Sequence, residues 1–243
     1  MPRPTASRIR GILFDKDGTL IDFRSQWMPA YRAAVDMLSG GDEALARRLL
    51  QLGGYDPVSN HLDPTSPLAC GTIRQIVEVW AGGLGVPVTE ALYERVQEVF
   101  HEIAIANANP VTDLQALFGR LKARGYVIGV ATTDSTATAR ANLETFGVAG
   151  LVDFVAGADA GHGVKPAPGM LLAFCAAGGF APEETAMVGD SLVDMMMGRN
   201  ANAGLVVGVT SGVTPRARLE PYADVVLDSV AQVESALIDN PNR

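Results

Sequence analysis

Cysteine and histidine are rare in this chain of 243 residues, which limits the kinds of site it can build. Its two cysteines, Cys70 and Cys175, stand far apart among apolar residues, and no second pair accompanies them. We therefore expect two buried thiols rather than a disulfide or a metal site. The three histidines, His61, His101 and His162, lack the spacing of zinc ligands.

Long hydrophobic runs are also missing from the sequence. No stretch approaches the roughly 20 consecutive apolar residues that cross a bilayer. Residues 1–10 are polar and basic, and no apolar segment follows them as it would in a secretory signal peptide. We therefore expect a cytoplasmic protein that has no membrane partner.

Positive charge is in short supply, and the formal net charge is -8. This balance argues against nucleic acid as a partner, because binding a phosphate backbone requires a basic surface. A small anionic substrate stays compatible with it, since a bound cation or a few local positive groups can offset the field. Lysine is the scarcer cation, present as Lys16, Lys122 and Lys165, so the positions of these residues are informative.

The sequence does contain a series of short apolar runs that end in polar or glycine-rich turns. The runs that we predict as strands are residues 9–14, 126–131, 152–156, 186–188, 205–209 and 225–227. Helical patterns separate the later runs, at residues 114–124, 135–146, 168–177 and 192–200. Apolar strands that alternate with helices are typical of a parallel sheet covered on both faces. We therefore predict an α/β fold.

The interval between the first two apolar runs has a different pattern, because no strand is evident from residue 23 to residue 107. Helical patterns occupy this interval, at residues 27–38, 43–52, 72–81 and 89–106. Pairs such as Gly53-Gly54 and Asp56-Pro57 separate them. We predict two domains: an α/β core formed by residues 1–22 and 108–243, and an inserted α-helical domain formed by residues 23–107.

Two aspartates follow the first apolar run, in the segment Asp15-Lys16-Asp17-Gly18-Thr19-Leu20. Residues two apart on an extended segment point the same way, so Asp15 and Asp17 would repel each other without a cation or a proton. Magnesium prefers oxygen ligands and would remove this conflict. One carboxylate could then attack phosphorus while the other handles protons. A solvated Asp-Gly turn is the simpler interpretation, and the position directly after an apolar strand argues against it.

Hydroxyl groups and a lysine follow two other predicted strands. Thr132 and Thr133 follow the run at residues 126–131 and could hydrogen-bond phosphoryl oxygens, although they could equally cap the next helix. Lys165 lies among prolines and glycines between a strand and a helix, where its ammonium could neutralise a transferring phosphoryl group. A solvated loop lysine is the alternative interpretation of Lys165.

A second acidic pair, Asp190 and Asp194, follows the run at residues 186–188. The two acids lie four residues apart across a predicted helix start, so both could face a metal ion at the strand end. Capping of the helix by Asp190 or Ser191 is the alternative interpretation. Together these strand-end residues provide a nucleophile, an acid/base, a metal site, a hydroxyl and a cation. That combination predicts metal-assisted phosphoryl transfer.

The order and spacing of these segments resemble the haloacid dehalogenase superfamily, specifically its phosphatases with a helical type-1 cap. The motifs that carry the resemblance are Asp15-Lys16-Asp17-Gly18-Thr19-Leu20, Thr132, Lys165, and Gly189-Asp190 with Asp194. They stand in the expected order and span nearly the whole chain. The resemblance implies a Rossmann-like core, with residues 23–107 as the cap domain.

The resemblance also implies roles for the acidic residues. Asp15 would be the nucleophile, and Asp17 would act as general acid and then as general base. The implied cofactor is Mg²⁺, held by Asp15, Asp190 and the backbone carbonyl of Asp17. Asp194 would assist in holding the metal, directly or through water.

Thr132 and Lys165 are implied to hold the phosphoryl group, and Thr133 is a further candidate for that role. Two departures from the family pattern lie beside the acids. Lys16 replaces the usual apolar residue between the aspartates, and Phe23-Arg24 replaces a more common serine-containing stretch. Both departures leave the chemistry intact and leave the substrate open.

A closing cap would exclude water and favour a small phosphorylated metabolite as the substrate. The cap resembles that of phosphoglycolate phosphatases, so 2-phosphoglycolate is the preferred expectation. The candidates for contacting the leaving group are Arg24, Trp27, His61 and Arg74. A surface arginine and a packed aromatic are the alternative interpretations of Arg74 and Trp27, and each is the preferred one for that residue taken singly. The alternatives are a phosphomutase like β-phosphoglucomutase, a phosphatase of another sugar phosphate or nucleotide, and a phospho-acceptor signalling domain. We expect a monomer or a homodimer.

Overall fold

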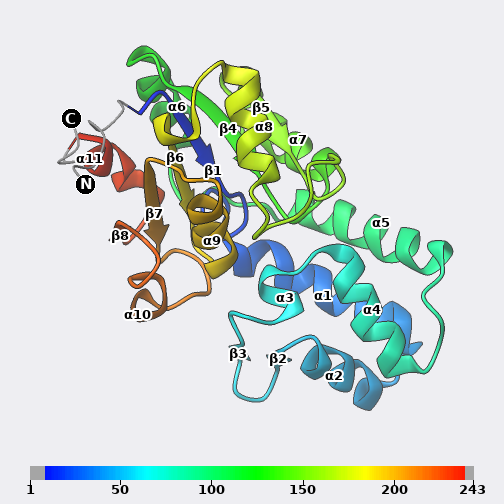
Figure 1. The fold of residues 1–243 in the computed structure, drawn as a ribbon. Helices are drawn as coiled ribbons and strands as arrows, with labels where there is room; N and C mark the ends of the chain where they lie inside the picture. The colour runs from blue at the N-terminus through cyan, green and yellow to red at the C-terminus, as the bar shows by residue number, and fades with distance from the viewer. Residues whose placement is uncertain (1–8, 239–243) are drawn as a thin grey trace. The chain divides into compact units, whose positions relative to one another are not determined.

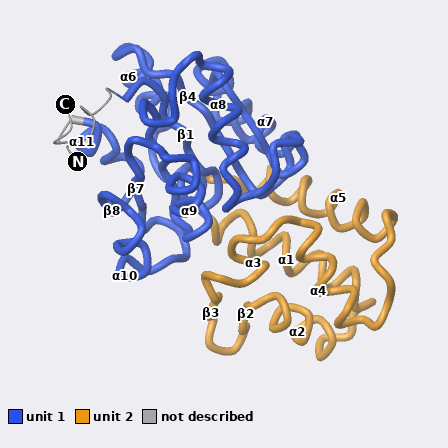
Figure 2. The backbone as a smooth tube through the Cα atoms, viewed as in Figure 1, with its two compact units in different colours: residues 1–22, 110–243 blue, residues 23–109 orange. Residues whose placement is uncertain are grey.

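The computed structural model describes residues 9–238, which form two compact units (Figure 1). The first unit contains the residues up to 22 together with those from 110 onward, and the second is Phe23–Asn109 (Figure 2). The first unit is thus made from two pieces of chain. The second unit is one continuous piece that lies between them in the sequence.

A six-stranded parallel sheet forms the centre of the first unit, with its strands in the order β5-β4-β1-β6-β7-β8. The strands are β1 (Gly11–Phe14), β4 (Val127–Ala131), β5 (Phe154–Ala156), β6 (Thr185–Gly189), β7 (Leu205–Val209) and β8 (Val225–Leu227). The chain adds strands first on one side of β1 and then on the other, which places the switch point of the sheet at β1. The predicted α/β fold is confirmed.

Helices cover both faces of this sheet, and the side chains of β1 show which helix lies on which face. The Phe14 ring lies 5.5 Å from the ring of Phe118 in α6, whereas Leu13 shares an apolar cluster with Phe174 of α8. Adjacent strand residues point to opposite faces, so α6 and α8 lie on opposite faces. The helices are α6 (Leu114–Ala123), α7 (Thr136–Thr145), α8 (Gly169–Gly178), α9 (Leu192–Asn200), α10 (Arg216–Leu219) and α11 (Val233–Ile238).

The right-handed connections between parallel strands place the remaining long helices. The connection through α7 runs from β4 outward to β5, and the connection through α9 runs from β6 outward to β7 on the other side of β1. Because such crossovers are right-handed, α7 and α9 lie on opposite faces of the sheet. By the same rule α8, which leads from β5 back to β6, lies on the face of α9, as Figure 1 shows.

Side-chain caps fix where α7 and α9 begin. Ser135 accepts a hydrogen bond from the backbone N–H of Thr138, and Ser191 forms a reciprocal capping box with Asp194. Such caps satisfy backbone donors that the first helical turn leaves without partners. The cap uses Oδ2 of Asp194 and leaves its Oδ1 for a contact with Lys165. Capping is therefore compatible with a second role for Asp194.

The second unit is mainly helical and has an aromatic core of its own. Its helices are α1 (Phe23–Ser39), α2 (Glu43–Leu52), α3 (Pro67–Cys70), α4 (Ile73–Leu84) and α5 (Glu90–Ala106). The Phe100 ring of α5 lies 5.4 Å from Trp27, 5.6 Å from Tyr31 and 5.9 Å from Trp80. Edge-to-face contacts of this kind bind three helices to one another through apolar surface.

A short hairpin in the second unit departs from the prediction that residues 23–107 contain no strand. Strands β2 (Tyr55–Asp56) and β3 (His61–Leu62) pair antiparallel. Asn60, with a φ of 53°, and the Asp56 side chain, which accepts from the Val58 N–H, shape the turn between them. Strands of two residues are too short to show an alternating apolar pattern, so the sequence did not reveal them.

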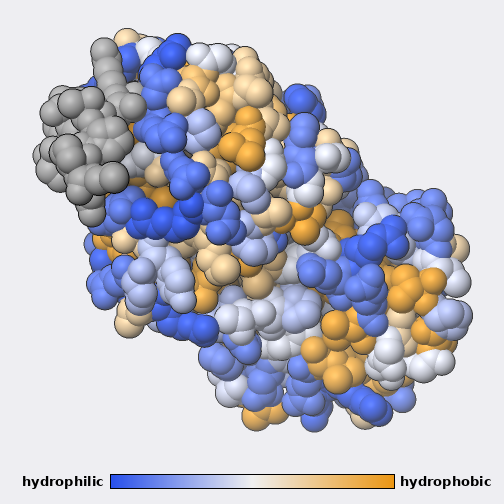
Figure 3. Space-filling view, viewed as in Figure 1, coloured by the Kyte–Doolittle hydropathy of each residue, from blue (hydrophilic) through white to orange (hydrophobic). Residues whose placement is uncertain are grey.

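The two cysteines agree with the expectations only in part. Neither cysteine forms a disulfide, and Cys175 is buried as expected, whereas the prediction of burial is wrong for Cys70, which is only half-buried. None of the helices in residues 9–238 has the length and apolar character needed to cross a membrane. On the face drawn in Figure 3, hydrophobic residues form separate groups among hydrophilic ones.

Candidate active site

The polar residues singled out in the sequence lie at the carboxyl ends of the central strands. Asp15 and Asp17 follow β1, Thr132 and Thr133 follow β4, and Asp190 follows β6. Because β4, β1 and β6 are parallel neighbours, these ends meet at one edge of the sheet. Ligands of open α/β sheets bind at this edge, next to the switch point. The structure therefore places these residues where chemistry is expected.

Three buried carboxylates converge at this edge. Asp15, Asp190 and Asp194 each present an oxygen, and these oxygens all lie within 4.8 Å of one another. Burial and the neighbouring charge of Asp194 raise the pKa of Asp15 to about 7, despite the opposing effect of Lys165. Burial, together with the charges of Asp15 and Asp194, also raises the pKa of Asp190 well above its usual range. The protein thus holds more negative charge here than its own cations offset.

Lys165 provides the positive charge inside this acidic group. Its Nζ lies 2.5 Å from Oδ1 of Asp15 and 2.6 Å from Oδ1 of Asp194, and its side chain is 1% exposed. Burial alone would lower the pKa of Lys165, but the carboxylates of Asp15 and Asp194 outweigh burial and raise it. The lysine is therefore a fixed ammonium group and not a solvated loop residue.

Glycines and a loop hold Asp190 close to the end of β1. The Asp190 carboxylate accepts from the Val213 N–H at 3.1 Å and from Thr19 Oγ1 at 3.4 Å. A Cβ added to Gly18, whose φ is 88°, would lie 2.6 Å from an Asp190 carboxylate oxygen, and one added to Gly212 would overlap the same carboxylate. Both glycines are therefore needed for Asp190 to approach the site.

The donor set fits a hard divalent cation. Carboxylate oxygens are the ligands that Mg²⁺ prefers, and Asp15, Asp190 and Asp194 bring three of them into one buried group. A divalent charge would offset the repulsion that raises the pKa values of Asp15 and Asp190. The arrangement supports a metal site without a histidine or a cysteine.

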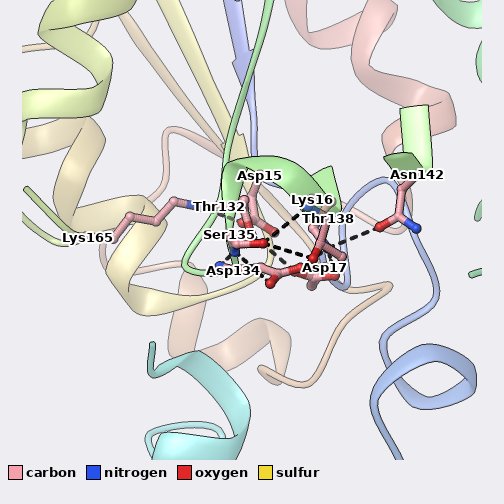
Figure 4. A network of polar contacts seen from close by, with 9 residues as sticks. All are labelled: Asp15, Lys16, Asp17, Thr132, Asp134, Ser135, Thr138, Asn142 and Lys165. Atoms are coloured by element: carbon pink, nitrogen blue, oxygen red, sulfur yellow. Dashed lines mark hydrogen bonds and ion pairs between the residues drawn. The ribbon is translucent and has the colours of Figure 1, made fainter. Parts of the chain in front are cut away.

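Asp17 lies beside the acidic group and is the more accessible carboxylate, with its side chain 12% exposed. Its Oδ2 accepts a hydrogen bond from Oγ1 of Thr132 at 3.2 Å, so the structure joins the ends of β1 and β4 (Figure 4). Thr132 is fully buried, whereas Thr133 is half-buried. Both hydroxyls follow β4, and only that of Thr132 contacts an acid of the site among the hydrogen bonds of the described residues.

A second buried lysine was not predicted as a site residue. Lys16 is 1% exposed, and its Nζ lies 2.8 Å from Asp17 Oδ1, 2.8 Å from Asp134 Oδ2 and 3.4 Å from Asn142 Oδ1. Burial disfavours the charged ammonium, but Asp134 and Asp17 outweigh it and raise the pKa of Lys16. The sequence did contain a signal, because a lysine between two aspartates just beyond the end of an apolar strand is unusual.

A model of the haloacid dehalogenase-like hydrolase family matches residues 9–202, which include every strand-end residue described above. The chain belongs to this family. It is therefore a hydrolase, and the predicted superfamily is confirmed. The match includes residues from both pieces of the first unit and the whole of the second unit.

Individual relatives of this hydrolase cover nearly its full length. A phosphoglycolate phosphatase from Haemophilus influenzae is 35% identical over 229 residues, which are 92% of this chain and 96% of that protein. A protein named "Probable phosphatase IndB" from Dickeya dadantii is 31% identical over 232 residues, 93% and 92% of the two chains. A solved hydrolase from Pseudomonas syringae shares the fold with a TM-score of 0.70 at 21% identity, covering 95% of this chain and 98% of that one.

The residues predicted to contact the leaving group lie in the second unit, and the structure shows the surroundings of each within that unit. Arg24 donates to Asn60 Oδ1 at 3.1 Å, and Trp27 is buried in the aromatic core. Arg74 lies 3.5 Å from Glu90 and stacks over the Tyr93 ring, with its side chain 51% exposed. His61 is exposed on β3. The four residues thus have different surroundings within the unit.

Proposed function

We propose that this hydrolase is a magnesium-dependent phosphatase that cleaves a small phosphate monoester through an aspartyl-phosphate at Asp15. The observation that carries the proposal is the buried group at the end of β1. There the Lys165 ammonium contacts both Asp15 and Asp194. One carboxylate oxygen from each of Asp15, Asp190 and Asp194 lies within 4.8 Å of the others. A nucleophilic carboxylate, a cation and metal ligands within one site suit phosphoryl transfer.

The first step forms a bond between an Asp15 carboxylate oxygen and phosphorus and breaks the bond between phosphorus and the ester oxygen. The leaving alkoxide takes a proton from Asp17, which lies beside the nucleophile and whose side chain is 12% exposed. Lys165 offsets the negative charge that develops on the phosphoryl oxygens, and the Thr132 hydroxyl can donate to one of them. The product of this step is the free alcohol and phosphorylated Asp15.

The second step regenerates the enzyme. A water molecule attacks phosphorus, Asp17 accepts a proton from that water, and the bond between phosphorus and the Asp15 oxygen breaks to release inorganic phosphate. Asp17 thus gives a proton in one step and takes one back in the next. Its contact with Lys16 keeps the carboxylate at the site in both steps, so the Thr132 hydroxyl can turn from Asp17 to a phosphoryl oxygen when substrate binds.

The metal ion would be held by the Asp15 and Asp190 carboxylates and the backbone carbonyl of Asp17, with Asp194 assisting directly or through water. When bound, Mg²⁺ would neutralise the clustered carboxylates and the phosphoryl charge. The raised pKa values of Asp15 and Asp190 support this assignment, since they reflect charge that the protein alone leaves uncompensated.

The substrate that we propose is 2-phosphoglycolate. The support is sequence identity of 28–35% with curated relatives named phosphoglycolate phosphatase, which align with more than nine-tenths of this chain. Residues 23–107 would act as the cap that selects the leaving group, with Arg24, Trp27 and Arg74 as the candidate contacts. A sugar phosphomutase, or a phosphatase of another sugar phosphate or nucleotide, would use the same strand-end residues. The cytoplasmic location and the monomeric or homodimeric state stay predictions.

Purified protein assayed with Mg²⁺ against a panel of phosphorylated metabolites tests the proposal. We expect inorganic phosphate to be released, fastest from 2-phosphoglycolate, and Asp15→Asn to abolish release while keeping the fold. Conversion of a sugar phosphate into its isomer without release of phosphate would instead establish a phosphomutase. Turnover by Asp15→Asn within tenfold of wild type would remove Asp15 from the nucleophile role.

A further inference from the structure

The carboxylate of Asp17 is part of a closed ring of contacts (Figure 4). Lys16 Nζ contacts Oδ1 of Asp17 and Oδ2 of Asp134, each at 2.8 Å. Thr132 closes the ring, because its Oγ1 donates to Oδ2 of Asp17 at 3.2 Å and accepts from the backbone N–H of Asp134 at 3.1 Å. Both carboxylate oxygens of Asp17 are therefore held, one by an ammonium and the other by a hydroxyl.

The far side of the ring is fixed to α7. Oδ1 of Asp134 accepts from the backbone N–H of Ser135 at 2.6 Å, and Asn142 Oδ1 lies 3.4 Å from Lys16 Nζ. Asp134 and Lys16 are 4% and 1% exposed. Because both side chains are buried and hydrogen-bonded, the Lys16 ammonium has a defined position relative to the ends of β1 and β4.

The charges indicate that Lys16 does more than neutralise Asp134. A single ion pair would satisfy a buried aspartate, yet the ammonium is shared between Asp134 and Asp17 at equal distance. Asp134 is not a member of the carboxylate group at Lys165, which contains Asp15, Asp190 and Asp194. Lys16 therefore links a carboxylate outside the metal group to the carboxylate proposed to move protons.

We propose that Lys16, held in place by Asp134, is a positioning residue that sets the orientation of the Asp17 carboxylate for proton transfer. The proposal rests on the proposed phosphatase function, in which Asp17 protonates the leaving group. It predicts a selective effect on chemistry. Esters whose leaving groups need a proton should depend on Lys16, and esters whose leaving groups depart as stable anions should not.

The test compares phenyl phosphate with p-nitrophenyl phosphate, because phenol is a much weaker acid than p-nitrophenol while the two rings are similar in size. The value of kcat/KM reports the steps through departure of the leaving group, so it isolates proton donation from later hydrolysis of the phosphorylated enzyme. We expect Lys16→Met to lower kcat/KM for phenyl phosphate about tenfold more than for p-nitrophenyl phosphate. Equal losses on both esters, or no loss on either, would overturn the proposal.

A second pair of variants separates positioning from folding. Lys16→Met leaves Asp134 buried without its ammonium, which destabilises the fold, whereas Lys16→Met/Asp134→Asn removes both charges. We expect the double variant to unfold at a temperature closer to that of wild type and to keep the selective loss on phenyl phosphate. Recovery of phenyl phosphate turnover together with stability would show that Lys16 is structural and would overturn the proposal.

An Asp17→Asn background shows whether Lys16 acts through Asp17. There we expect Lys16→Met to cause no further change in the ratio of kcat/KM values for the two esters, since the proton donor is already absent. A further change by the same factor would show that Lys16 acts by another route and would contradict the proposal. Wild-type protein that releases phosphate from neither ester fails earlier, at the proposed function, and removes the basis of the positioning role with it.

Discussion

The two buried lysines of this hydrolase occupy similar surroundings on different sides of β1. Each ammonium contacts two aspartates at 2.8 Å or less: Asp15 and Asp194 around Lys165, and Asp17 and Asp134 around Lys16. Both side chains are 1% exposed, and in both cases the carboxylates outweigh burial and raise the lysine pKa. Burial and charge alone therefore do not distinguish them.

The difference lies in what surrounds each pair. The acids at Lys165 belong to a group with Asp190 that has the oxygen ligands for a metal ion, so this cluster carries excess negative charge. The acids at Lys16 are joined to each other through Thr132 and to the start of α7. One lysine thus lies in the group that has the oxygen ligands for a metal ion, and the other completes a closed ring of ion pairs and hydrogen bonds.

Among the variants that test this comparison, removal of the Lys165 ammonium should have the largest effect on turnover. We expect Lys165→Met to lower kcat by about 10²–10³, the usual loss when one fixed charge-stabilising group is removed from a transition state. Steady-state turnover of p-nitrophenyl phosphate measures the loss. Lys122→Met is the matched control, because Lys122 is a partly exposed lysine that pairs with Asp153. If both variants kept wild-type turnover, Lys165 would have no role in the chemistry.

The carboxylates on the two sides should differ in metal binding. We expect Asp190→Asn to weaken Mg²⁺ binding at least about tenfold, since the amide loses a charged oxygen ligand in the metal group. Asp134→Asn, a buried aspartate outside that group, should bind Mg²⁺ as wild type does. Calorimetric titration of chelator-treated protein measures both affinities. Equal weakening in the two variants would contradict the assignment of the metal to Asp190.

Low pH should stabilise the metal-free protein through protonation of Asp15, which contacts Lys165. The pKa of Asp15 is raised from 3.8 to about 7 in the folded state, so folding favours its protonated form. That stabilisation is complete below pH 3.8 and is lost as the pH rises to about 7, because the folded state holds the Asp15 proton that the unfolded state has already released. The melting temperature of chelated wild type should therefore fall across this range.

Asp15→Asn is the control for this pH dependence, because it removes the titrating group while keeping the shape of the side chain. Its melting temperature should fall less than that of wild type over the same range, with the remainder due to Asp190 and other groups. Added Mg²⁺ should restore stability most at the upper end of the range, where the carboxylates are charged. Parallel profiles for wild type and Asp15→Asn would show that Asp15 has no raised pKa.

An arginine in the second unit should show the smallest effect. Arg74 is half-exposed and contacts Glu90 and Tyr93, in contrast to the two buried lysines. If it contacts an acidic leaving group, Arg74→Ala should raise KM for 2-phosphoglycolate while turnover of p-nitrophenyl phosphate stays near wild type. Arg24→Ala, assayed in parallel, tests the other arginine candidate, which donates to Asn60. Identical kinetics for wild type and Arg74→Ala on both substrates would leave Arg74 as a surface residue.

Much of the fold could be predicted because its strands are apolar throughout and its helices are separated by clear turns. The run at residues 205–209 coincides with β7, and the pattern at residues 192–200 coincides with α9. The hairpin of β2 and β3 could not be predicted, because two-residue strands have no periodicity to detect. Local patterns therefore specify long elements well and very short ones poorly.

The site residues likewise include some that local sequence patterns predict and some that they do not. Asp15, Lys165 and Asp194 were selected because each stands at the end of a strand or the start of a helix, and the parallel sheet brings such positions together. The pairing of Lys16 with Asp134 could not be predicted. It depends on a side chain reaching from the end of β1 to a residue 118 positions later, which no local pattern encodes.

Direct detection of phosphorylated Asp15 tests the central claim. Wild-type protein mixed with substrate and Mg²⁺, then quenched in acid within milliseconds, should yield a peptide phosphorylated at Asp15 by mass spectrometry. The modification should be sensitive to hydroxylamine, as acyl phosphates are, and should decay at least as fast as kcat. Phosphate release without label on Asp15, or label that persists for many minutes in magnesium buffer, would contradict a phosphatase that works through this residue.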